Sequence, residues 1–310
     1  MIKNKRNLGC VVLLLTAIVW GFGITIQSIS GQTLGSFTVV FFKALGAILL
    51  IPISIILKQR FTKDAFIGGV ICGLIMVVGN VAQQKGIESS SIGKASFITA
   101  LYMVFVPIIG ILFFKRKTKT IVWIGVIIAV IGMYLLCVKE SLALTSGDTW
   151  LILCAICFAL QILVADKYVM TTDPIPLACV QSITMCVISG ICMLIFEKPD
   201  IVAIKSAWFT LLYSALLSCC FAQTAQIVFQ KYVEPTLASL LMSLESVFGV
   251  ISGFLILNQT LSIKELIGCA LIFVAAIIAQ KQWSSNRHFS FGFSIIELCL
   301  TIRFVLSQQV

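Results

Sequence analysis

Charged residues are scarce in this sequence of 310 residues. Asp, Glu, Lys and Arg make up 11% of it, whereas soluble domains carry about 25%. Hydrophobic residues reach 60% and the mean hydropathy is +1.11, which excludes a water-soluble globular protein. A membrane-spanning helix takes about 20 residues. Ten such helices would leave only short connections and no room for a soluble catalytic domain.

Histidine is almost absent, since His288 is the single one. The sequence also has no HExxH, GxSxG or P-loop motif and no metal-ligand cluster. We therefore expect no enzymatic activity, no cofactor and no bound metal. Most of the 12 cysteines lie inside apolar runs, where cysteine acts as a small hydrophobic residue.

One pair of cysteines is separated by only two residues. Cys154-x-x-Cys157 matches the spacing of redox and metal sites, although it falls in the middle of an apolar run. An intramembrane thiol protein built on Cys154, Cys157, Cys219 and Cys220 therefore stays open as an alternative.

Acidic residues are also few: 12 stand against 22 Lys and Arg, for a formal net charge of +10. Such an excess in a membrane protein marks its cytoplasmic loops. With a cytoplasmic N-terminus, 15 basic residues fall inside and six outside. The bias predicts a multi-pass protein of the cytoplasmic (inner) membrane with both termini in the cytoplasm. Its partners would be the lipid bilayer and a small solute, with no nucleic acid, and a homodimer stays open.

Ten apolar runs are long enough to be spanning helices. The fold class predicted is an all-α polytopic membrane protein with ten transmembrane helices. The predicted helices cover residues 8–29, 36–57, 65–84, 92–114, 120–138, 149–170, 174–196, 207–230, 235–257 and 263–281.

The two halves of the sequence resemble each other at a constant offset of 143 residues. Because each half holds five helices, an odd number, the halves must be inverted relative to each other in the membrane. Inverted repeats are common in secondary transporters, where the solute site lies between the halves. The predicted units are a first repeat at 1–138, a second at 139–281 and a tail at 282–310. The polar pairs at this offset are Asn80 with Gln223, Gln83 with Gln226, and Tyr102 with Glu245.

Lys43 and Glu245 are charged residues inside predicted spans. A charge in the membrane is costly unless it faces a wet cavity or a partner. Lys43 could instead extend its stem to the interface, and Glu245 could serve only helix packing. If functional, Glu245 is placed to take and release a proton during transport, and Gly249 and Gly253 on its face would allow another helix to approach closely.

Neutral polar residues complete the candidate translocation site. Amides three apart on a helix face need partners or water in the hydrocarbon region, either from interhelical hydrogen bonding or along a solute path. Pro107, in the fourth span, is expected to kink its helix. The predicted site residues are Trp20, Lys43, Asn80, Gln83, Tyr102, Gln161, Gln181, Gln223, Gln226 and Glu245.

Four segments carry a family resemblance: Trp20-Gly21-Phe22, Gly93 to Pro107, Gly147-Asp148, and Ser243 to Phe248. Through them the chain resembles the EamA-like branch of the drug/metabolite transporter superfamily over roughly residues 8–281. The resemblance implies two inverted five-helix repeats and export or exchange of small metabolites, often amino acids or related compounds, through a central cavity. Coupling to a proton or a counter-substrate is typical of that family.

The chain departs from the family pattern in two places. Gly-Glu often follows the fourth and ninth helices of the family, but here the residues are Lys115-Arg116 and Asn258-Gln259. The basic residue of the second helix, often Arg, is Lys43, which keeps the charge but loses bidentate geometry. The tail contains Gly292 to Leu298, which looks like a prepilin processing motif, and we expect an interfacial helix or poor order there.

Together these features predict an integral membrane secondary transporter that moves a small metabolite by alternating access through a central cavity, with proton coupling at Glu245. The alternatives are the thiol protein above and a non-transporting membrane protein whose buried polar groups serve packing or partner binding.

Overall fold

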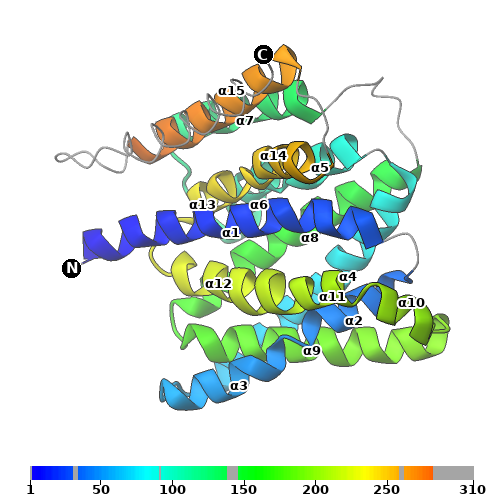
Figure 1. The fold of residues 1–310 in the computed structure, drawn as a ribbon. Helices are drawn as coiled ribbons and strands as arrows, with labels where there is room; N and C mark the ends of the chain where they lie inside the picture. The colour runs from blue at the N-terminus through cyan, green and yellow to red at the C-terminus, as the bar shows by residue number, and fades with distance from the viewer. Residues whose placement is uncertain (1, 31–33, 91, 138–145, 258–261, 282–310) are drawn as a thin grey trace.

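A computed structural model describes residues 2–30, 34–90, 92–137, 146–257 and 262–281. Within these ranges the chain is helical and contains no strand (Figure 1). Among the described residues, nine helices are long and apolar enough to cross a membrane, and the shorter apolar helix Thr120–Leu136 coincides with the remaining predicted span. The all-α polytopic fold class is therefore confirmed.

The observed helices follow the predicted spans closely, with ends that differ by a few residues. The helices are α1 (Ile2–Ser30), α2 (Ser36–Ala44), α3 (Ala47–Ile56), α4 (Lys63–Ser89), α5 (Ile92–Ala100), α6 (Tyr102–Phe114), α7 (Thr120–Cys137), α8 (Ser146–Val169), α9 (Pro174–Phe196), α10 (Ile201–Ser206), α11 (Trp208–Tyr213), η1 (Ser214–Gln223), α12 (Thr224–Gln230), α13 (Pro235–Met242), α14 (Glu245–Leu257) and α15 (Ile263–Lys281).

Local sequence explains several helix ends. The Thr62 hydroxyl accepts a hydrogen bond from the backbone N–H of Ala65 and so caps α4, satisfying a donor that the first helical turn leaves unpaired. Pro174 occupies the start of α9, where its missing N–H costs nothing. At the end of α6, Lys115 adopts a left-handed conformation with φ 50°. This is the position at which the family often has glycine, the residue that adopts such a φ without steric cost.

Three predicted spans are interrupted near their middles. The second span divides into α2 and α3, the fourth into α5 and α6, and the ninth into α13 and α14. In the ninth, the Ser243 hydroxyl donates to the carbonyl of Leu240 at 2.8 Å, and side-chain bonds of this kind compete with helical ones. The fourth is interrupted at Leu101, while α6 continues through Pro107. A kink was expected at this proline, but the interruption of the span lies six residues earlier.

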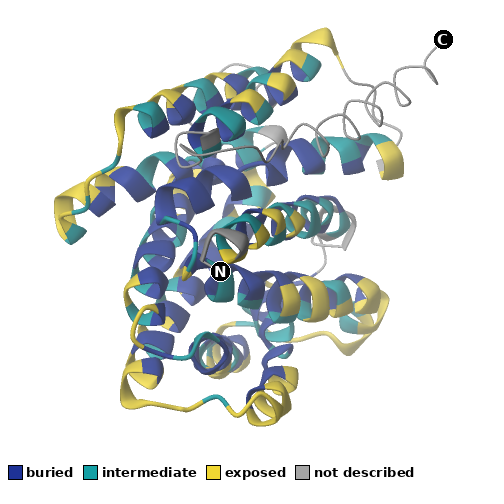
Figure 2. Cartoon of the chain, turned by 90° about the vertical axis from the view of Figure 1, so that its left-hand side faces the viewer, coloured by how far each residue is buried: buried dark blue, intermediate teal, exposed yellow. Residues whose placement is uncertain are grey.

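Burial divides the long helices into an inner and an outer face (Figure 2), whereas the short α13 is buried along its whole length and α10 has no buried residue. Large apolar side chains such as Ile55, Phe113 and Leu194 are more than two thirds exposed. A lipid environment accommodates such side chains, and helix contacts inside a membrane use small residues. The exposed apolar faces are therefore the lipid-facing surface of the bundle.

Glycines set the closest helix contacts. α7 and α15 lie side by side along one edge of the bundle (Figure 1). A Cβ atom placed on Gly132 would lie 2.8 Å from the carbonyl oxygen of Gly268, and one on Gly268 would lie 2.5 Å from that of Gly132. Only glycine fits at either position, because each backbone packs directly on the other.

The predicted tail, residues 282–310, and the predicted boundary between residues 138 and 139 lie outside the described residues. The expectations for the prepilin-like motif and for an interfacial helix therefore stay predictions.

Candidate functional site

A cavity lies in the middle of the bundle, and its lining comes from both halves of the chain. The empty space between its lining atoms, including the part that is open to solvent, is about 670 Å³. Eight of the ten predicted site residues line it: Trp20, Lys43, Gln83, Tyr102, Gln161, Gln223, Gln226 and Glu245.

The other two predicted residues, Asn80 and Gln181, do not line the cavity but form hydrogen bonds with residues that do. Lys43 lies one residue before the end of α2, and its Nζ donates to the Asn80 Oδ1 at 2.8 Å. Asn80 in turn donates from Nδ2 to the carbonyl of Met76 at 2.8 Å. The ammonium group is thus held by a neutral amide at the cavity wall, a position that leaves it able to meet an anionic group of a solute.

Three glutamines form a chain of hydrogen bonds. The Nε2 of Gln226 donates to the Oε1 of Gln161 at 3.0 Å, and the Nε2 of Gln161 donates to the Oε1 of Gln181 at 3.1 Å. All three side chains are at most 3% exposed. The chain joins α12, α8 and α9 and orders the amides at one wall of the cavity.

Tyr102 and Glu245 occupy equivalent places in two interrupted helices. Tyr102 is the first residue of α6 and Glu245 the first of α14. Both side chains are at least nine-tenths buried. Backbone hydrogen bonding continues through both interruptions: Val104 donates to the carbonyl of Leu101, and Val247 donates to that of Leu244. The breaks therefore place two polar side chains at the cavity.

α1 packs closely on the segment that carries Glu245. A Cβ on Gly21 would lie 2.5 Å from the carbonyl oxygen of Glu245, and the Thr25 Oγ1 lies 2.6 Å from the Ser252 Oγ. The neighbouring Trp20 donates from Nε1 to the carbonyl of Ser218 in η1 at 3.2 Å. A Cβ on Gly249 would meet only ordinary contacts at 3.7 Å and beyond, so Gly21 is the small residue that this crossing requires.

Sequence reasoning missed the apolar part of the lining and the irregular helix beside it. A π-helix often marks a functional site, and η1 contributes Ser218 and Gln223 to the cavity. Hydropathy could not single out the apolar residues, because the whole span is apolar. The lining residues that were not predicted are Gly23, Ile24, Met76, Phe158, Ile162, Ser218 and Met242.

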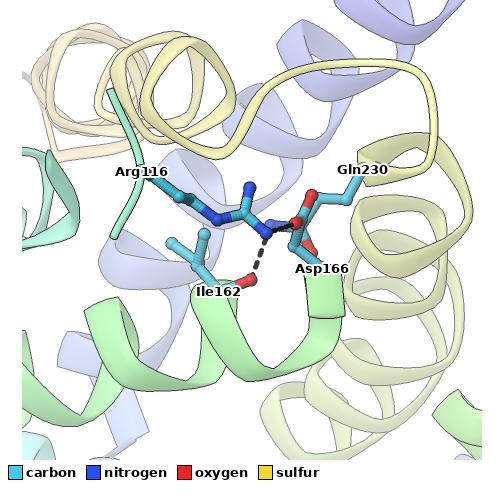
Figure 3. Close-up of polar contacts among 4 residues, drawn as sticks. All are labelled: Arg116, Ile162, Asp166 and Gln230. Carbon is cyan, nitrogen blue, oxygen red and sulfur yellow. Dashed lines mark hydrogen bonds and ion pairs between the residues drawn. The ribbon is translucent and has the colours of Figure 1, made fainter. Parts of the chain in front are cut away.

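Two ion pairs join helices beyond opposite ends of the cavity. The Lys94 Nζ lies 2.5 Å from Asp148 Oδ2, and Ser90 donates to Asp148 Oδ1 at 2.8 Å. At the other end of α8, Arg116 Nη2 donates to Asp166 Oδ2 (Figure 3). Both aspartates are buried, at 1% and 7% side-chain exposure.

Glu234 lies between the spans that end at Gln230 and begin at Pro235, and it interacts electrostatically with both members of the second ion pair, Arg116 and Asp166. Burial raises the pKa of this carboxyl above its ordinary value, while the positive charges of Arg116 and Lys119 act in the opposite direction. Asp166 adds to the rise through like-charge repulsion.

The model of the EamA-like transporter family matches residues 7–138 and again residues 145–280. The chain belongs to the EamA-like transporter family. Its resemblance to that family is thus confirmed, and it is a multi-pass membrane transporter. Each of the two matched regions contributes residues to the cavity of this EamA-like transporter.

Two further similarities extend over most of this EamA-like protein. It is 27% identical over 281 residues to an uncharacterized transporter of Archaeoglobus fulgidus, covering 90% of this chain and 87% of the relative. A crystal structure with 14% sequence identity superposes with a TM-score of 0.74 over 89% of this chain and 99% of that one. At that identity the superposition shows a shared fold only.

Proposed function

We propose that this protein is a secondary transporter of a small metabolite that carries both an anionic and a cationic group, such as an amino acid or a related compound. Lys43 and Glu245 supply opposite charges to one cavity, and this observation carries the proposal. The amides between them offer both donors and acceptors, while Trp20, Phe158 and Met242 supply apolar contact.

The proposed mechanism is alternating access in the cytoplasmic membrane, with both termini in the cytoplasm. The repeats at 1–138 and 139–281 would lie inverted around the cavity and exchange conformations, exposing the cavity first to one side and then to the other. The direction would be export or exchange. The two matched regions and the equivalent positions of Tyr102 and Glu245 support this arrangement.

Glu245 is the proposed proton-coupling group. It is buried at a cavity wall, where a carboxyl alternates between neutral and charged forms only if protons reach it. No ion pair within 4.0 Å joins Glu245 to Lys43, both of which lie in the described part of the chain. A solute or a proton can therefore compensate the carboxylate during the cycle.

The test is uptake and counterflow in proteoliposomes, with a set of amino acids and related organic ions as candidate solutes. Lys43→Met should weaken solute affinity at least roughly 10-fold, the value of one hydrogen bond to a charged group. Glu245→Gln should abolish stimulation by a pH gradient while keeping counterflow. Lys205→Met, which removes an exposed charge from α10, is the matched control. Normal affinity in Lys43→Met, or undiminished pH-driven transport in Glu245→Gln, would contradict the respective role.

The same variants separate the alternative functions. If the polar groups served only packing, Lys43 and Glu245 substitutions would lower thermal stability, and no solute would shift the melting temperature of the parent protein. If the protein were a thiol protein, activity would be lost when Cys154, Cys157, Cys219 and Cys220 are replaced by Ala or Ser.

A further inference from the structure

The ion pairs Lys94–Asp148 and Arg116–Asp166 share one helix, α8. Asp148 and Asp166 are separated by five full turns at about 3.6 residues per turn, so they face the same side of α8 about 27 Å apart. That separation is close to the hydrocarbon thickness of about 30 Å. The cavity-lining Ile162 lies one turn before Asp166, so the cavity is between the two pairs.

The partners of these aspartates lie on a span that is not continuous. Lys94 lies in α5, Arg116 lies two residues beyond the end of α6, and Leu101 separates these two half-helices. α8 itself is unbroken from Ser146 to Val169. Each ion pair therefore fixes a different half-helix to the same rigid support.

Each ion pair also joins the two regions of the chain that match the family model. Lys94 and Arg116 belong to the first region, whereas Asp148 and Asp166 belong to the second. A solute could pass between these helices to a membrane surface only if the two regions moved apart at that surface.

We propose that the two ion pairs are alternating gates. Separation of Arg116 from Asp166 lets α6 move and opens the cavity at that end, while Lys94–Asp148 holds α5 and keeps the opposite end closed; the reverse exchange opens the other end. This inference rests on the proposed alternating-access function.

The surroundings of the two pairs differ in a way that sets their ease of opening. The Arg116 side chain is 35% exposed, against 13% for Lys94, and water screens a more exposed pair more strongly. The Arg116 end is therefore the gate that separates more readily.

Hydrogen–deuterium exchange of the purified full-length protein tests the proposal without any solute. In Arg116→Gln, exchange should rise in peptides covering 110–119 and 159–169 and fall in peptides covering 92–99 and 146–152. Lys94→Gln should produce the reverse pattern. The coupling between two sites typically amounts to about 5-fold or more, and a change of that size is expected. Lys117→Gln, an exposed neighbour of Arg116, should leave exchange unchanged.

A charge-exchanged variant guards against simple misfolding. Arg116→Asp combined with Asp166→Arg should restore the parent pattern if the ion pair itself is responsible. Exchange that rises at both ends in Arg116→Gln, or changes at the Arg116 end alone, would overturn the gating role and indicate packing. Because exchange needs no substrate, reciprocal changes without measurable transport would count against the proposed function and not against the gates.

Discussion

Lys43 donates its hydrogen bond to the amide oxygen of Asn80 and not to a carboxylate. A neutral partner holds the ammonium group at the cavity wall without cancelling its charge. The consequence is testable, because an acidic residue in place of Asn80 would supply the missing counter-charge.

Asn80→Asp should therefore weaken binding of a solute that carries an anionic group. The new carboxylate would pair with Lys43, and we expect an affinity loss of about 10-fold or more, measured as the shift in solute concentration that stabilises the protein against heat. Asn80→Ser keeps a neutral polar group and serves as the matched control. Equal affinity in the Asp and Ser variants would contradict the anion-binding role of Lys43.

Gln161 is the middle member of the three-glutamine chain, so its removal affects two partners. Gln161→Leu leaves the Nε2 of Gln226 and the Oε1 of Gln181 without their present bonds. We expect a loss of about 1–2 kcal/mol of stability, measured as a lower melting temperature or denaturant midpoint. Gln83→Leu provides the comparison, since Gln83 also lines the cavity but is not a member of this chain. Equal destabilisation by both would show that the chain itself adds nothing.

Gly21 and Gly249 lie on the two sides of one helix crossing, and we expect them to differ in their tolerance of substitution by alanine. A methyl group at position 21 would lie 2.5 Å from the backbone of Glu245, whereas one at position 249 finds 3.7 Å of clearance. Gly21→Ala should force α1 away from α14, lowering the melting temperature and impairing transport, and Gly249→Ala should leave both nearly unchanged. Overpacking of this kind typically costs about 1–3 kcal/mol. The reverse order of effects would contradict the packing described for α1.

Glu234 predicts a pH dependence of stability. Its pKa is higher in the folded protein because the carboxyl is partly buried, so the folded state binds a proton more readily than the unfolded chain. Stability should therefore decrease as the pH rises from about 4.3, the ordinary glutamate pKa, through the raised value. Glu234→Gln should remove this contribution, so that the variant gains melting temperature over the parent at neutral pH but not near pH 4. Glu88→Gln, at an exposed position near the end of α4, controls for loss of charge, and the same gain there would contradict the assignment to Glu234.

Hydropathy and charge were sufficient to predict the span count, and polar residues inside spans were sufficient to predict much of the cavity. Lys43, Glu245 and the glutamines are conspicuous because their burial in lipid is costly. The helix break at Leu101 was not predictable in this way, since the sequence there is as apolar as the rest of the span. The break after Met242 falls in the polar segment Ser243 to Ser246, which was interpreted as part of one continuous span. Serine back-bonding at Ser243 is visible only in the structure. The role of Asp166 was likewise hidden, because its partner Arg116 lies 50 positions away.

Because of the helix breaks, membrane insertion and the chemistry of the cavity depend on different residues. Insertion into the membrane depends on the apolar outer faces, such as those bearing Ile55 and Leu194. Under the proposed function, the chemistry of the cavity depends on the few residues at or beside the ends of half-helices, above all Lys43, Tyr102 and Glu245. A change of side chain at these interruptions would then alter the solute that the cavity accepts and leave unchanged the signals that direct the chain into the bilayer during biosynthesis.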